Sequence, residues 1–116
     1  MFNDRFISLI CRPILHVGSY SIEDMAMFYR GYTLCAVEHD LYDDTYSLVG
    51  FQEYVQKKYN ALETIDWATI LQNVYTGKEN AYRHLVADLN DYLKHIGKKE
   101  RFVRNSEKGL YEYIYK

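Results

Sequence analysis

Proline is almost missing from this chain, which has one, Pro13, and only six glycines among 116 residues. Because proline breaks helices and is excluded from central strands, the rest of the chain is free to form long regular elements. Apolar side chains recur along it at spacings of three and four residues, the period of a helix. The sequence therefore predicts an all-α fold, a single compact bundle of about five helices that spans residues 1–116.

The expected helices differ in how clearly their ends are marked. Ser21 is a good N-cap for the second helix, and Gly97 follows the fifth helix where a C′ glycine belongs. Pro13 ends the first helix, because a residue before proline is disfavoured in the α region. We expect 14–20 to form a connector or a short strand. The expected helices are 4–12, 22–38, 48–59, 66–75 and 78–96.

The second expected helix carries apolar residues on more than one face, so we expect it to be central and contacted on several sides. Gly31 lies in its middle, although glycine costs roughly 1 kcal/mol relative to alanine inside a helix. A close crossing by another helix is the usual reason for such a glycine. We therefore predict a close crossing at Gly31.

The fifth expected helix has the clearest division into an apolar and a charged face. We expect the following residues to face the core: Tyr82, Leu85, Leu89, Tyr92, Leu93 and Ile96. We expect the following charged residues to face solvent: Arg83, Asp88, Asp91 and Lys94.

Residues 98–116 form a basic tail after the last expected helix, and we expect it to pack on the helical domain. Turns are expected at 105–106 and 108–109, which contain asparagine, serine and glycine. Residues 110–115 are mostly aromatic or aliphatic and favour a short strand or a further helix.

The sequence contains none of the motifs that mark phosphate-binding loops, dinucleotide-binding turns, zinc proteases or serine hydrolases. It therefore predicts a protein that is not an enzyme and that binds no cofactor. His39 lies between Glu38 and Asp40, the one place that suggests a metal site. Adjacent side chains do not converge on one ion, so we predict no metal there.

Cys11 and Cys35, the two cysteines, stand among apolar residues, and we interpret both as reduced, buried thiols. This use of cysteine is typical of a cytoplasmic protein. The N-terminus lacks the pattern of a signal peptide, and no apolar stretch approaches the length of a membrane span. We therefore expect no membrane partner.

A run of acidic and aromatic residues follows the second expected helix. Carboxylates at a helix C-terminus meet the negative end of the helix dipole, so their presence there is unfavourable. Tyrosine next to carboxylate is well suited to bind a cationic groove on a partner protein. The alternative is a solvated loop that keeps the protein soluble. The predicted partner-binding residues are Glu38, Asp40, Tyr42, Asp43, Asp44 and Tyr46.

A second charged segment, 94–104, combines five cations with Phe102. Basic residues with an aromatic side chain can follow a phosphate backbone, so a small nucleic-acid-binding or adaptor protein is the alternative function. Two features disfavour binding of nucleic acid: Glu100 lies within the segment, and the net charge of the chain is −2.

Two stretches within residues 12–32, R-P-I-L-H-V-G-S-Y-S and F-Y-R-G-Y, resemble small bacterial immunity proteins of contact-dependent growth inhibition and polymorphic toxin systems. These positions correspond to a connector, a helix cap and a packed helix, so no toxin-contacting residue is carried over. The matching residues are Arg12, Pro13, Gly18, Ser21, Phe28, Gly31 and Tyr32.

The resemblance implies a protein that binds and neutralises one cognate toxin domain. Many such toxins are nucleases with basic clefts that bind phosphate. An acidic loop with tyrosines is the physical complement of such a cleft, and the acidic run is where we expect the toxin domain to bind.

Overall fold

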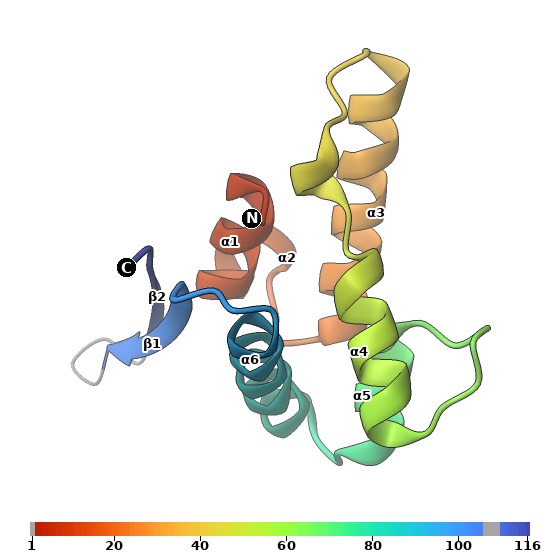
Figure 1. Ribbon diagram of the computed structural model, residues 1–116, viewed down its shortest axis with the longest axis vertical. Helices are drawn as coiled ribbons and strands as arrows, with labels where there is room; N and C mark the ends of the chain where they lie inside the picture. The colour runs from red at the N-terminus through yellow and green to blue at the C-terminus, as the bar shows by residue number, and fades with distance from the viewer. Residues whose placement is uncertain (1, 106–109) are drawn as a thin grey trace.

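The computed structural model describes residues 2–105 and 110–116 (Figure 1). The described residues form six α-helices, a short 3₁₀ helix and two strands. The elements are α1 (Asp4–Cys11), α2 (Pro13–Val17), α3 (Ile22–Glu38), η1 (Asp44–Tyr46), α4 (Val49–Tyr59), α5 (Trp67–Val74), α6 (Lys78–His95), β1 (Arg101–Asn105) and β2 (Leu110–Ile114). The chain is mostly helical, as expected, but the described residues form six helices rather than about five, and the C-terminal tail adds a small antiparallel sheet to the predicted all-α fold.

Local signals place the ends of several helices. The Ser21 hydroxyl accepts a hydrogen bond from the Asp24 N–H at 3.3 Å, as an N-cap does. Gly97 has a φ of 80°, and the next N–H, of Lys98, donates to the Leu93 carbonyl at 2.9 Å. This is the glycine-terminated helix end that the sequence predicts for α6.

The segment after Pro13 is helical, so the expected connector or strand over 14–20 is wrong for its first residues. Pro13 occupies the first position of α2, where its missing N–H and its fixed φ favour a helix. The same proline therefore separates α1 from α2. Gly18 ends α2 with a φ of 75° and donates its N–H to the Ile14 carbonyl at 3.0 Å.

α6 lies at the centre of the structure and packs against α3, α4, α5 and β1. Its side chains Leu85, Leu89 and Leu93 are fully buried, as predicted. Two predictions for this helix are wrong. Ile96 is exposed because it lies just beyond the last turn, and Asp88 is only 2% exposed because α4 covers it.

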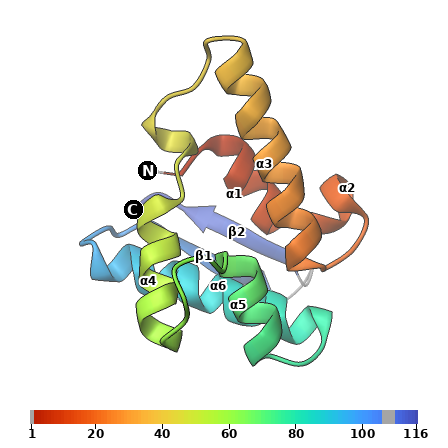
Figure 2. The ribbon, with the colours of Figure 1, turned by 90° about the vertical axis from the view of Figure 1, so that its right-hand side faces the viewer.

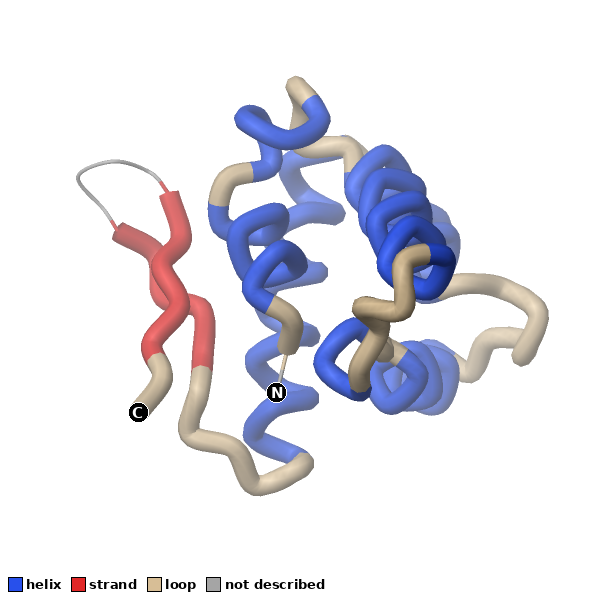
Figure 3. Tube along the Cα trace, turned by 90° about the horizontal axis from the view of Figure 1, so that it is seen from above, coloured by secondary structure: helices blue, strands red, loops and turns tan. Residues whose placement is uncertain are grey.

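The C-terminal strands form a hairpin that lies as a separate layer beside the helices (Figures 2 and 3). β2 packs on α1 and β1 packs on α6, with Phe102 opposite Tyr113 in the antiparallel register. The tail is thus packed on the helices and forms strands rather than a further helix. Of the turns expected at 105–106 and 108–109, only Asn105 is described, as the last residue of β1, and residues 106–109 lie outside the described part of the chain.

The predicted close crossing at Gly31 is wrong. Among the described residues, no atom lies within 4 Å of the point where a Cβ on Gly31 would sit, apart from its own helix and chain neighbours. The close approach occurs at Gly50 of α4 instead, where a Cβ would lie 3.2 Å from Cζ of Tyr92 and still closer to its hydroxyl oxygen. Gly50 therefore permits α4 to pack on α6.

The second half of α3 and the loop after it stand above the other elements in Figure 1. Cys35 lies on this part of α3 and is exposed, so the prediction that both thiols are buried holds for Cys11 only. No helix in residues 2–105 or 110–116 is both long and apolar enough to cross a membrane.

Candidate functional site

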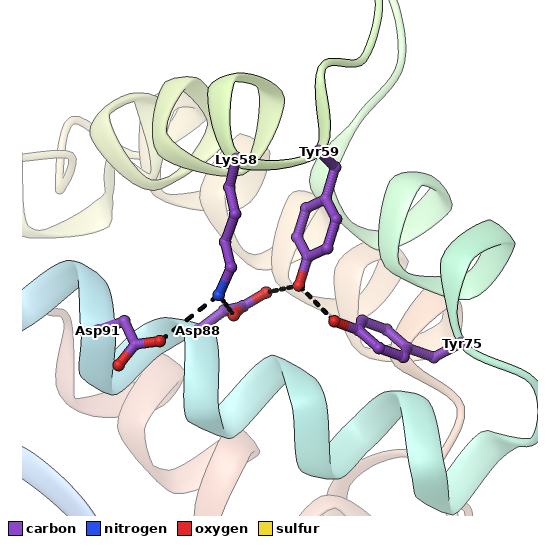
Figure 4. Close-up of polar contacts among 5 residues, drawn as sticks. All are labelled: Lys58, Tyr59, Tyr75, Asp88 and Asp91. Atoms are coloured by element: carbon purple, nitrogen blue, oxygen red, sulfur yellow. Dashed lines mark hydrogen bonds and ion pairs between the residues drawn. The ribbon is translucent and has the colours of Figure 1, made fainter.

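A buried carboxylate, Asp88 of α6, is the centre of a polar network (Figure 4). Its two oxygens accept hydrogen bonds from Lys58 Nζ and from the Tyr59 hydroxyl, both at 2.6 Å. The Tyr59 hydroxyl also lies 2.8 Å from that of Tyr75, and Lys58 Nζ lies 3.5 Å from Asp91. The network thus joins α4, α6 and the end of α5.

These contacts shift the pKa values of Tyr59 and Lys58. Burial, followed by the hydrogen bond to Asp88, raises the pKa of Tyr59 far above its usual value. Partial burial lowers the pKa of Lys58, but the hydrogen bond and the charge of Asp88 outweigh it, and the net shift is upward. A neutral phenol and a charged amine both stabilise the buried carboxylate, so we interpret the network as a structural tie.

The acidic run begins where α3 ends. α3 ends at Glu38, and its last turn contains no basic residue, so the unfavourable dipole contact expected from the sequence is present. Asp40 adopts a left-handed φ of 57°, and the following N–H, of Leu41, donates to the Ala36 carbonyl at 2.8 Å. Asp40 thus occupies the position that glycine usually fills at a helix C-terminus.

The rest of the acidic run is held in place by backbone contacts. Asp43 caps the 3₁₀ helix η1, and its side chain accepts the Thr45 N–H at 2.9 Å. The Thr45 carbonyl accepts the Asn3 N–H at 2.9 Å, which ties the loop to the start of α1. Asp44, in the first turn of η1, is exposed. The loop therefore has a defined shape, although it lies at the surface.

The tyrosines of the acidic run stack on one another. The Tyr42 and Tyr46 rings lie 5.4 Å apart at 29°, and the Tyr46 and Tyr32 rings lie 5.5 Å apart at 19°. The Tyr29 hydroxyl donates to the Tyr46 carbonyl at 2.9 Å, and the Tyr29 ring packs edge-on against Phe6. A continuous row of rings thus leads from the core to the exposed ring of Tyr42.

The carboxylates of the acidic run take part in no ion pair within the described residues. The ion pairs there join Arg30 to Asp66 and Lys58 to Asp88 and Asp91. The structure thus brings the predicted residues together at the end of α3 and on the ordered loop that follows it, and residues 38–46 are called the acidic loop below. Most of them project to solvent, whereas Tyr46 is half-buried. The exposed carboxylates are Glu38, Asp40, Asp43 and Asp44.

An open groove of about 700 Å³ adjoins this loop. The middle of α3, from Ala26 to Leu34, forms one wall, α4 forms the other, and Tyr42 and Tyr46 close one end. Leu34 and Val49 present exposed apolar side chains from the two walls. Glu53 and Glu63 add further carboxylates to the rim.

The sequence does not predict this groove, because its pattern indicates that the apolar residues of α3 are covered on several sides. Leu34 of α3 is instead exposed. The available signal was the excess of apolar residues around α3, since a small protein has few elements to cover more than one face of a helix.

The basic segment 94–104 has a different character from the acidic loop. Its cations are exposed, but Phe102, its aromatic residue, is only 3% exposed and packs against Tyr113. Phe102 is therefore not available to stack on a base. Among the described residues, no group of three or more His, Cys, Asp or Glu side chains is placed to hold a metal ion.

No family model, no curated protein and no solved structure matches this chain.

Proposed function

We propose that this chain is an immunity protein that binds and neutralises a cognate bacterial toxin domain, a nuclease, in the cytoplasm. The observation that supports the proposal best is the acidic loop, where four exposed carboxylates lack an ion-pair partner among the described residues and surround a stacked tyrosine pair. Charges of one sign gathered on an ordered loop complement a cationic cleft.

The loop has two roles in this mechanism. Its carboxylates create a local negative field, which speeds the encounter with a basic toxin surface and weakens as salt is added. Tyr42 supplies a rigid aromatic contact at the tip of the row of rings, and burial of such a ring slows dissociation. A loop already ordered by Asn3 and Asp43 also loses less conformational entropy on binding.

The test is rescue of growth and direct binding with the toxin domain encoded by the reading frame next to this gene. Isosteric neutralisation keeps the loop intact, because asparagine still tolerates the left-handed φ at position 40 and still caps η1 from position 43. The loop variant combines Glu38→Gln, Asp40→Asn, Asp43→Asn and Asp44→Asn. The control makes the same change in net charge elsewhere, with Glu23→Gln, Asp24→Asn, Glu79→Gln and Glu112→Gln.

We expect the unmodified chain and the control to rescue growth, and the loop variant to bind at least about tenfold more weakly with a shallower salt dependence. Equal binding and equal salt dependence for the two variants would show that the acidic loop is not the site. Absence of both rescue and binding by the unmodified chain would reject the immunity function.

The alternative use of the basic segment is checked with the same protein. A titration with DNA and with RNA at two salt concentrations reports phosphate contacts, because these weaken steeply as salt rises. Binding with such a slope, and its loss when Lys98 and Lys99 are changed to glutamine, would favour the nucleic-acid function instead.

A further inference from the structure

Exposed apolar side chains face the groove beside the acidic loop from both of its walls. Leu34 faces it from α3. Val49 faces the groove from the first turn of α4, and Tyr42 lies at the end next to the acidic loop. Such a concentration of exposed apolar surface is typical of a protein interaction site.

The walls of the groove are fixed before any partner binds. The Gln52 side chain donates to the Ile65 carbonyl at 2.8 Å and accepts the Trp67 N–H at 2.7 Å. Gln56 Nε2 donates to the Glu63 carbonyl at 2.9 Å. These bonds tie the chain between α4 and α5 to α4, so the end of the groove that this chain segment lines keeps its shape.

The charge around the groove is mostly negative, so the groove favours a positively charged partner. Its rim contains Glu53, Glu63 and Asp66, and one cation, Arg30, which already pairs with Asp66 at 3.3 Å. The four carboxylates of the acidic loop belong to the segment whose Tyr42 and Tyr46 close one end of the groove. A second copy of this chain is a poor occupant, because α3 carries acids at both ends and any pairing of the two α3 helices sets acid against acid.

The construction of the walls selects the form of the partner. α3 and α4 satisfy their backbone N–H and C=O groups internally, so the groove offers no free edge to which a strand can be added. An apolar groove between helices instead receives an amphipathic helix, whose apolar side chains enter the groove while its polar face stays outside.

We propose that the groove between α3 and α4 binds a cationic amphipathic helix of the partner protein, with the apolar side chains of that helix placed between Leu34 and Val49. This inference deepens the proposed immunity function, because it names the structural element of the toxin domain that the protein recognises. The acidic loop then contacts basic residues at one end of the bound helix, and Glu53 and Glu63 contact those along its sides.

A defined peptide tests the groove without knowledge of the toxin. The probe is a labelled helix of leucine and lysine, about 14 residues long, with leucine at helical spacing. Its control has the same composition with leucine and lysine in strict alternation, which removes the helical stripe. Binding is followed by fluorescence anisotropy, and the contact surface is mapped by amide chemical-shift changes in the protein.

A matched pair of variants locates the binding. The groove variant is Leu34→Asn with Val49→Thr, where the two side chains are 57% and 63% exposed. The control variant is Leu15→Asn with Val74→Thr, on α2 and α5, where they are 80% and 49% exposed. We expect the groove variant to weaken binding of the helical probe about tenfold and the control to change it by less than about twofold.

The inference fails if both variants bind the helical probe equally, if the alternating peptide binds as tightly as the helical one, or if the shift changes avoid α3 and α4. Its failure is distinct from failure of the immunity function. If binding of the toxin domain depends on the acidic loop but not on the groove variant, the immunity function stands and the groove is not its binding site. If the groove binds the probe but the protein does not rescue growth from the toxin, the groove stands as a helix-binding site and the immunity function is rejected.

Discussion

The side chain of Asn90 on α6 forms two hydrogen bonds with the backbone of Phe102 in β1. The Phe102 N–H donates to Oδ1 at 2.7 Å, and Nδ2 donates to the Phe102 carbonyl at 2.9 Å. On the other strand, Arg12 Nη1 donates to the Tyr111 carbonyl at 2.6 Å. Both outer edges of the hairpin are therefore partly closed by helix side chains, which protects a two-stranded sheet from pairing with another chain.

Loss of the Asn90 amide leaves two backbone groups of Phe102, the buried residue of β1, unpaired. We expect Asn90→Ala to lower the free energy of unfolding by about 2–3 kcal/mol, since an unsatisfied buried donor or acceptor costs about 1–3 kcal/mol. Asn73→Ala, at an exposed position of α5, is the control and changes it by less than about 0.5 kcal/mol. Urea unfolding measures both. Equal stability of the two variants would contradict this role for Asn90.

Gly31 and Gly50 respond in opposite directions to the same substitution. Gly31→Ala adds a methyl group in open space on α3, so we expect stability to rise by up to about 1 kcal/mol. Gly50→Ala places a methyl group against the Tyr92 ring, which Phe51 and Tyr54 hold from other sides. We expect it to lower stability by about 1–3 kcal/mol. Thermal unfolding of the two variants measures both effects. A shift of the unfolding temperature in the same direction for both would contradict the packing described.

Local features of this fold could be predicted from the sequence, and features that depend on distant residues could not. The Ser21 cap and the Gly97 helix end each involve only a few neighbouring residues, and both are as predicted. Gly31 and Gly50 both lie within helices, and only the position of Tyr92 distinguishes their roles. Asp88 is buried because Lys58, thirty residues earlier in the chain, neutralises it.

The candidate site divides in the same way. The acidic loop could be predicted as a surface feature because charge, tyrosine and a helix end lie together in the sequence. The groove was not predicted, because Leu34 and Val49 are apolar residues of the kind that usually form a core. Whether an apolar side chain is covered depends on where other helices end, and α3 extends past its neighbours.

Asp40, just after the end of α3, lowers the stability of the fold, and we expect glycine at this position to raise it. Asp40→Gly removes a left-handed non-glycine residue and a carboxylate at the negative end of α3, so we expect about 1 kcal/mol more stability. Asn60, with a φ of 51° at the end of α4, is the control, because Asn60→Gly relieves the backbone alone. Denaturant unfolding should show a smaller gain for Asn60→Gly. An Asp40→Gly variant no more stable than the unmodified chain would contradict the interpretation.

The two cysteines should react at very different rates. Burial raises the pKa of the Cys11 thiol to about 11, so both its access and its ionisation are suppressed near neutral pH. Cys35 is exposed on α3. A thiol reagent at pH 8 should therefore modify one thiol per folded chain and two after unfolding. Cys35→Ser should abolish the rapid reaction, whereas Cys11→Ser should leave it, and rapid loss of both thiols in the folded chain would contradict the burial of Cys11.

The Tyr59 hydroxyl makes stability depend on alkaline pH. Burial and Asp88 raise its pKa in the folded state, whereas in the unfolded chain a tyrosine ionises at about pH 10. The folded form therefore keeps a proton that the unfolded form loses. This contribution is fully present below about pH 10 and falls above it by about 1.4 kcal/mol per pH unit for a phenol that ionises only on unfolding.

Tyr59→Phe separates this effect from general alkaline unfolding. The variant should be less stable than the unmodified chain at pH 8, because Asp88 loses a hydrogen bond, and its stability should fall less steeply between pH 10 and pH 11. Tyr115→Phe, at the exposed end of the chain, is the matched control. Urea unfolding at a series of pH values measures each slope. Parallel slopes for Tyr59→Phe and the unmodified chain would show that the Tyr59 phenol ionises alike in both states, and Asp88 would then owe its burial to Lys58 alone.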